Sequence, residues 1–113
     1  MNRDEASLLD AVTFAKNVTQ LIKGSNQETF ERDLRTQSAV LYQIAVLGEA
    51  VKRLSMEYRE QHPEIEWRAI AGMRDKIMHQ YDRVDLGLVW QVTQEDLPKL
   101  LAQLTPLLPQ PEE

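Results

Sequence analysis

The chain has 113 residues, a formal net charge of −5 and no cysteine. This length suits one domain with a substantial core, and the absence of cysteine excludes disulfide scaffolds and cysteine zinc sites and suits the reducing cytoplasm. The polar residues 1–5 do not resemble a signal peptide, and no apolar run approaches the roughly 20 residues of a membrane span. We therefore expect a cytoplasmic protein with no membrane partner.

The charge is unevenly distributed along the chain. Residues 52–83 contain seven Lys or Arg against six Asp or Glu, whereas the residues that follow contain only Lys99 against five acids. The overall negative charge argues mildly against nucleic acid as a partner. The middle of the chain is the segment that would repel a phosphate least.

Apolar residues recur at three- and four-residue steps in four stretches, which predicts helices and no strands. The first stretch covers residues 4–23 and ends at Gly24, a residue that favours a left-handed C-cap. The second, residues 27–54, is predicted to be a short helix followed by a longer one. Within the longer helix Gly48 costs up to about 1 kcal/mol, so we expect a neighbouring helix to approach closely there. Ser55 could cap a further short turn.

The second half of the chain predicts two more helices. One covers residues 67–81, and the other begins at Asp85, a good N-cap residue. Pro98 should kink that last helix or start a new one. The predicted fold is an all-α, four- to five-helix up-down bundle. Residues 1–108 are expected to form a single domain and residues 109–113 a flexible acidic tail.

Arg74 is out of place if residues 67–81 form one regular helix. At about 100° per residue it would lie near the centre of the apolar face, where an unpaired charge is costly. Asp75 and His79 would lie on the opposite side, four residues apart, so that the carboxylate could hold the imidazole. Either the helix ends before His79, or two copies of the segment meet across a dimer axis. Both routes predict a site at a helix end or at an interface.

Ordinary structural roles remain open for these residues. An arginine in an apolar stripe more often extends to solvent or pairs with a carboxylate, such as Glu49, than takes part in chemistry. A histidine at a helix end is usually solvated or a capping residue. Tyr81 could be a core residue with its hydroxyl at the rim, and Trp67 and Trp90 are most simply core residues or dimer anchors.

Residues 74–81 read RDKIMHQY, which has the pattern R-x4-H-x-Y. Residues 44–50 read IAVLGEA, and residues 62–74 read HPEIEWRAIAGMR. Together these segments resemble the HepT toxins of the HEPN superfamily over nearly the whole chain. Glu66 stands where that family usually has proline. An isolated R-x4-H occurs by chance in many proteins, but these neighbours at these spacings make the resemblance specific.

The resemblance implies a dimeric HEPN fold and RNA cleavage without a metal ion or other cofactor, by the toxin of a toxin–antitoxin pair. Arg74 would hold the scissile phosphate and stabilise the transition state. His79 would act as general acid or base, oriented by Asp75. Tyr81 would receive AMP from a minimal nucleotidyltransferase antitoxin, and AMP at this position would block the cleft.

Other basic residues could help to hold RNA in a shared cleft, namely Arg68, Lys76 and Arg83. Two further interpretations stay open. The chain could be a non-catalytic, nucleotide-binding docking subunit of a nucleotidyltransferase complex, or a purely structural helical dimer whose motif is coincidental.

Overall fold

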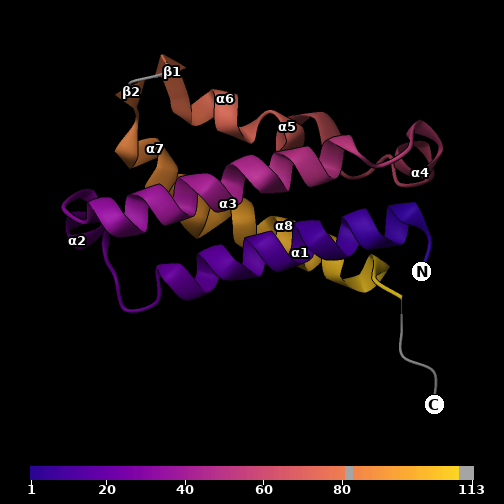
Figure 1. Ribbon diagram of the computed structural model, residues 1–113, viewed down its shortest axis with the longest axis horizontal. Coiled ribbons are helices and arrows are strands. Elements are labelled where there is room, and N and C mark those ends of the chain that lie inside the picture. Colours follow the sequence, from indigo (N-terminus) through magenta and orange to yellow (C-terminus); the bar gives the residue numbers. More distant parts are fainter. Residues whose placement is uncertain (81–82, 110–113) are drawn as a thin grey trace.

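The computed structural model of the chain describes residues 1–80 and 83–109, without the side chains of His79 and Gln80. Within these residues, four helical runs pass alternately up and down the molecule (Figure 1). They are α1 (Arg3–Leu21), α3 (Leu34–Lys52), α5 (Trp67–Ala71) with α6 (Met73–Ile77), and α7 (Leu86–Gln91) with α8 (Leu97–Leu104). Two short helices, α2 (Gln27–Glu31) and α4 (Met56–Gln61), lie between these runs. The predicted all-α bundle is confirmed.

The helix boundaries in the first half follow local signals in the sequence. Gly24, which follows α1, has a φ of 82°, the left-handed conformation that glycine adopts without steric cost. Asn26 caps α2, and its side chain accepts a hydrogen bond from the Thr29 backbone N–H at 2.9 Å. Ser55 caps α4 in the same way, since its hydroxyl accepts from the Tyr58 N–H at 3.0 Å. The predicted ends of these helices are thus confirmed to within two or three residues.

The last helical run is interrupted just before its proline. Asp85 caps α7, with its carboxylate accepting from the Leu88 N–H at 3.0 Å. Val92–Asp96 form a π-helical segment in which the Leu97 N–H bonds to the Val92 carbonyl, and Pro98 lies in the first turn of α8. A new helix therefore begins at the proline, which was one of the two predicted outcomes. A 3₁₀ turn (Thr105–Leu107) follows, and residues 110–113 of the predicted tail lie outside the described residues.

The third run differs from the prediction. Instead of one helix over residues 67–81, the chain breaks at Gly72, which separates α5 from α6, and leaves helical geometry after Ile77. The strands β1 (Met78–Gln80) and β2 (Arg83–Val84) then pair antiparallel. The Asp85 N–H donates to the Ile77 carbonyl at 3.0 Å. Two short strands are therefore present, where the sequence predicted none. The reversal that they form brings α7 back against the bundle.

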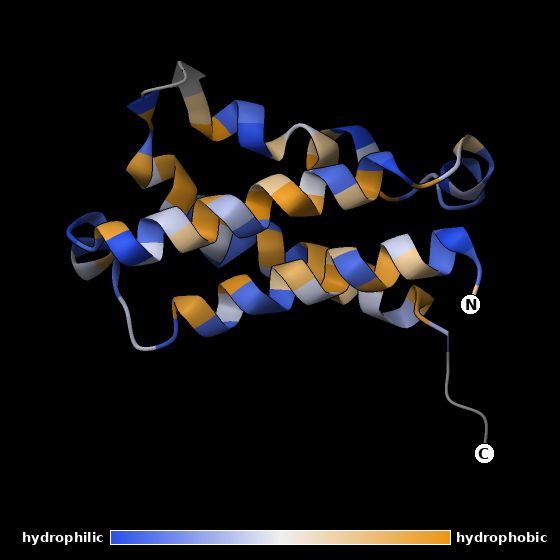
Figure 2. Cartoon of the chain, viewed as in Figure 1, coloured by the Kyte–Doolittle hydropathy of each residue, from blue (hydrophilic) through white to orange (hydrophobic). Residues whose placement is uncertain are grey.

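The core lies where the apolar faces of the four runs meet, and Figure 2 shows these faces turned toward one another along α1, α3 and α8. Trp67 is a core residue, 6% exposed, whose indole N–H donates to the His62 carbonyl at 3.0 Å. Trp90 is half-buried and tilts against Phe30, with ring centroids 5.5 Å apart. In the described part of the chain, no helix is long and apolar enough to cross a membrane.

Candidate functional site

The R-x4-H-x-Y segment begins in α6 and continues into β1. Met73 and Ile77 are the buried residues of α6, 5% and 0% exposed, and they fix this short helix against the bundle. The side chain of Arg74, by contrast, is 52% exposed. The expectation that Arg74 lies within the apolar face is wrong, because Ile70, Met73 and Ile77 form the buried face of this run and Arg74 lies beside it.

The end of α6 at Ile77 settles one of the two routes proposed from the sequence. His79 lies in β1, two residues past the helix, so Arg74 and His79 do not share one regular helix. The side chain of His79 and the whole of Tyr81 lie outside the described residues. The predicted contact between Asp75 and His79 therefore stays a prediction.

A cavity of about 220 Å³ lies beside Arg74, between α3 and the α5–α6 run. We call it the α3–α6 groove. Its base is the closest approach of the two runs, because a Cβ added to Gly48 would lie 3.0 Å from the carbonyl oxygen of Ala71. This confirms the close approach predicted at Gly48. The residues that line the groove are Ala45, Val46, Gly48, Glu49, Lys52, Ala71, Arg74 and Asp75.

Each wall of the groove carries one cation beside one carboxylate. On α3, Lys52 Nζ lies 3.5 Å from Glu49 Oε1, and on α6, Arg74 Nη1 lies 3.5 Å from Asp75 Oδ1. Among the described side chains, the partner of Arg74 is thus Asp75 and not Glu49. All four side chains are at least half exposed, and such surface pairs contribute only about 0–1 kcal/mol. Each cation can therefore exchange its carboxylate for a phosphate at little cost.

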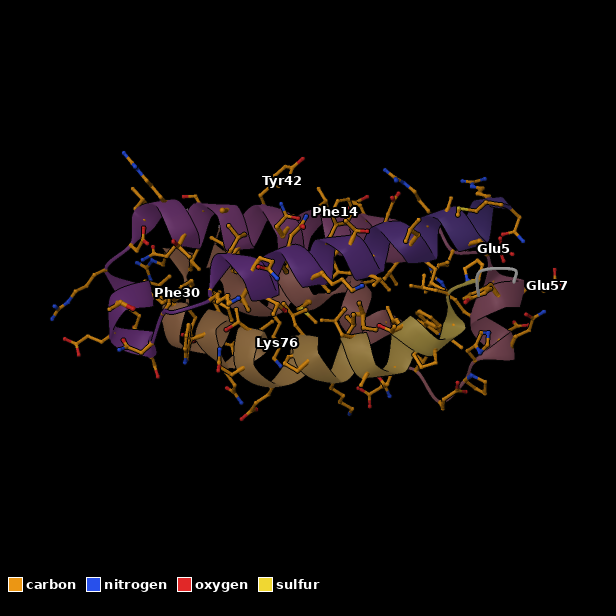
Figure 3. The ribbon with its side chains drawn as sticks, turned by 90° about the horizontal axis from the view of Figure 1, so that it is seen from below. Glu5, Phe14, Phe30, Tyr42, Glu57 and Lys76 are labelled. Atoms are coloured by element: carbon orange, nitrogen blue, oxygen red, sulfur yellow. The ribbon has the colours of Figure 1, made fainter. Side chains whose placement is uncertain are left out.

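The other predicted RNA-binding residues lie elsewhere on the surface. Arg68 on α5 and Arg83 on β2 are exposed and do not line the groove. Lys76 faces the opposite side of α6, where its Nζ lies 3.4 Å from Asp96 Oδ2. There it lines a separate cavity of about 350 Å³ between α6 and α8, and Figure 3 labels it beside α8.

Lys52 is a groove residue that lies outside the sequence motif. Its signal is the spacing of Ala45, Gly48, Glu49 and Lys52, which places all four on one helix face. These four residues line a groove only because α5 and α6 pack against that face. Among the described side chains, no group of three His, Asp or Glu residues is arranged to hold a metal ion.

Comparisons with known proteins agree with the motif. The sequence model of the family described as "Ribonuclease HepT-like" matches residues 10–107. A candidate RNase of Caldanaerobacter subterraneus is 37% identical over 87 residues, which cover 77% of this chain and 78% of that protein. A candidate RNase of Methanocaldococcus jannaschii is 31% identical over 109 residues, covering 96% and 94%.

A second protein of Methanocaldococcus jannaschii, named as a γ-glutamylcyclotransferase and candidate RNase, is 36% identical over 91 residues. The match covers 80% of this chain but only 41% of that protein. No solved structure matches the chain. Since the family match extends over residues 10–107 of 113 and includes the whole R-x4-H-x-Y segment, the chain belongs to the HepT-like ribonuclease family.

Proposed function

We propose that this chain is a metal-independent endoribonuclease that acts as the toxin of a toxin–antitoxin pair. The observation that carries the proposal is the course of the motif segment: α6 ends at Ile77, between Arg74 and His79. Arg74 is thereby held on an anchored helix beside an open groove, while His79 follows the helix in β1. The family to which the chain belongs supports RNA as the substrate.

The proposed chemistry is attack by a ribose 2′-hydroxyl on the adjacent phosphorus. A bond forms between the 2′-oxygen and phosphorus, and the bond from phosphorus to the 5′-oxygen of the next nucleotide breaks. His79, from one or both copies of the chain, takes the proton from the 2′-hydroxyl or gives one to the leaving 5′-oxygen. Arg74 donates hydrogen bonds to the non-bridging oxygens, which gain charge in the transition state. The products are a 2′,3′-cyclic phosphate and a 5′-hydroxyl.

In this proposal Asp75 has one role before the substrate binds and another after it has bound. In the free chain it is the partner of Arg74, and its side chain is 81% exposed. A phosphate bound to Arg74 replaces this weak pair and frees the carboxylate. Asp75 can then hold the imidazole of His79 in the orientation that proton transfer needs.

A homodimer completes the proposed site. Tyr42 is 63% exposed on α3 and lies on the same helix face as Ala45 and Glu49 of the groove. Figure 3 shows its side chain directed away from the bundle. An exposed aromatic residue beside a functional groove is typical of an interface anchor. A second copy seated on this face would bring two Arg74 side chains to a shared cleft.

The proposal includes silencing of the toxin by an antitoxin that is a minimal nucleotidyltransferase. AMP is transferred from ATP to the Tyr81 hydroxyl, so that a phosphorus–oxygen bond forms at tyrosine and pyrophosphate leaves. The attached phosphate lies two residues from His79 in sequence and competes for Arg74. Tyr81→Phe should therefore keep RNA cleavage and escape silencing. A variant that the partner still silences fully would contradict modification at Tyr81.

RNA cleavage by the purified chain in excess chelator tests the catalytic proposal. Wild type should cut RNA and leave 2′,3′-cyclic phosphate ends, while Arg74→Ala and His79→Ala should lose activity and keep their helical circular dichroism. Arg32→Ala is the matched control, because Arg32, the residue after α2, is also exposed and also pairs with a neighbouring carboxylate, that of Glu28. Activity that disappears with chelator, or that survives in His79→Ala, would contradict the mechanism. A folded wild type without activity would favour the docking subunit.

A further inference from the structure

We propose that the α3–α6 groove binds a guanine base of the RNA, next to the phosphate held by Arg74. The inference rests on the proposed ribonuclease function and adds a base-specific subsite to it. The size of the groove agrees with one base. A cavity of about 150 Å³ accommodates benzene, so the groove volume of about 220 Å³ suits the double ring of a purine better than a whole nucleotide.

The walls of the groove suit the flat faces of a base. Small apolar side chains at the bottom, those of Ala45, Val46 and Ala71, leave room beside the backbone at Gly48. Single-stranded RNA is recognised through bases that leave the stack, enter such sites and form hydrogen bonds with their Watson–Crick edges. The polar groups of the groove stand at its rim, where such an edge would emerge.

Lys52 and Glu49 together complement the edge of guanine. The ammonium of Lys52 is a pure donor and the ionised carboxylate of Glu49 a pure acceptor, and they lie side by side, with Nζ 3.5 Å from Oε1. Guanine presents the O6 acceptor beside two donors, the N1–H and the N2 amino group. Lys52 can donate to O6 while both oxygens of Glu49 accept from the two donors. The weak pair between Lys52 and Glu49 is thus exchanged for three hydrogen bonds.

The other three bases make fewer bonds with the same two groups. Along this edge adenine offers one amino donor and one ring-nitrogen acceptor, cytosine offers one amino donor with a ring-nitrogen and a carbonyl acceptor, and uracil offers one ring N–H between two carbonyls. Each can satisfy Lys52 once and Glu49 once, which leaves one carboxylate oxygen without a partner. Guanine alone offers a donor to each oxygen of the Glu49 carboxylate. Guanine is therefore the preferred occupant.

Arg74 connects the subsite to the reaction. It stands on the opposite wall of the same groove from Lys52 and Glu49. The groove therefore selects the nucleotide adjacent to the scissile phosphate.

The test is binding of the four nucleoside 3′-monophosphates to the isotope-labelled protein, followed by the backbone amide resonances of Gly48 and Ala71 at the base of the groove. We expect 3′-GMP to shift both resonances and to bind about fivefold or more tightly than the other three, since a bidentate base contact contributes at least about that factor. Glu49→Gln should remove this preference, because the amide retains one acceptor and presents donors to the guanine donors. Glu28→Gln, which removes an equally exposed carboxylate paired within its own helix, should keep it.

Two results would overturn the subsite: equal affinities for the four nucleotides, or a guanine preference that survives Glu49→Gln. Shifts that miss both Gly48 and Ala71, and the absence of any shift at millimolar nucleotide, would do the same. Different results would refute the guanine subsite and the ribonuclease function. RNA cleavage in chelator with no nucleotide preference would refute the subsite alone. A guanine preference without RNA cleavage would refute the ribonuclease function and leave the groove as a nucleotide-binding site.

Discussion

Replacing Gly48 with alanine should impair both RNA cleavage and stability. The added Cβ would lie 3.0 Å from the carbonyl oxygen of Ala71 and 3.7 Å from its carbonyl carbon, so one of the two runs must move by a few tenths of an ångström. Alanine gains about 1 kcal/mol from helix propensity, whereas overpacking of this kind costs about 1–3 kcal/mol. The net change in the free energy of unfolding should be a loss of between zero and about 2 kcal/mol.

Activity should also fall because Ala71 precedes Arg74 by only three residues. A shift of the Ala71 carbonyl is passed through Gly72 to α6 and moves the guanidinium relative to the groove. Since a misplacement of about 1 Å can cost 10²-fold in rate, a few tenths should cost on the order of tenfold. Single-turnover RNA cleavage and urea unfolding of the same preparation measure the two effects separately.

Gly87→Ala is the matched control for this substitution. Gly87 also lies inside a helix, α7, but its added Cβ would meet Asp85 Oδ1 at 3.6 Å and Gln27 Nε2 at 3.8 Å, which are ordinary contacts. This variant should be unchanged or stabilised by up to about 1 kcal/mol, with full activity. If Gly48→Ala behaved in the same way, the contact between Gly48 and Ala71 would not be what positions Arg74.

Three further substitutions test other parts of the structure. Hydrogen bonds from the Ser55 backbone N–H and hydroxyl lower the pKa of Asp4 in the folded chain. The Asp4 carboxylate therefore stabilises the fold at pH values above its unfolded-state pKa. This stabilisation is lost as the pH falls through the lower folded-state pKa. Asp4→Asn should therefore flatten the acid side of the stability profile, measured by urea unfolding across pH. Tyr42→Glu should weaken the proposed homodimer in sedimentation experiments, whereas Met56→Glu, at an equally exposed apolar residue on α4, should not. Trp67→Phe should lower the thermal unfolding midpoint by an amount equivalent to about 0.5–1.5 kcal/mol, because the part-buried His62 carbonyl loses its indole donor and keeps only the Ile65 N–H.

The parts of the fold that could be predicted from sequence are those fixed by neighbouring residues. Gly24 and Ser55 act within one turn of their own helices, and Pro98 acts through the amide hydrogen that it lacks. The signal at Gly48 was of a different kind, since a glycine inside a strong apolar stripe costs stability and so indicates a close neighbour. It predicted the contact correctly but could not say that Ala71 would make it.

The end of α6 could not be predicted because no local signal marks it. Residues 73–86 contain no glycine or proline, and their apolar spacing continues through Tyr81. The helix ends because of tertiary contacts: Ile77 is completely buried, and its carbonyl accepts from the Asp85 N–H as the chain reverses. The position of Arg74 was mispredicted for the same reason, since the helical wheel counted residues 78–81, which follow the end of α6, as part of the apolar face.

In the proposed mechanism, the place where α6 ends lets a short motif present an arginine and a histidine to one phosphate. On a continuous helix residues 74 and 79 would be rotated by about 140° from each other, at about 100° per residue, so no single ligand could contact both. Burial of Met73 and Ile77 on either side fixes Arg74, while β1 frees residue 79 from helical geometry. The pairing of Met78 with Val84 then determines the course of the backbone at His79. In the proposed mechanism, the spacing between Arg74 and His79 therefore works because the helix ends between these two residues.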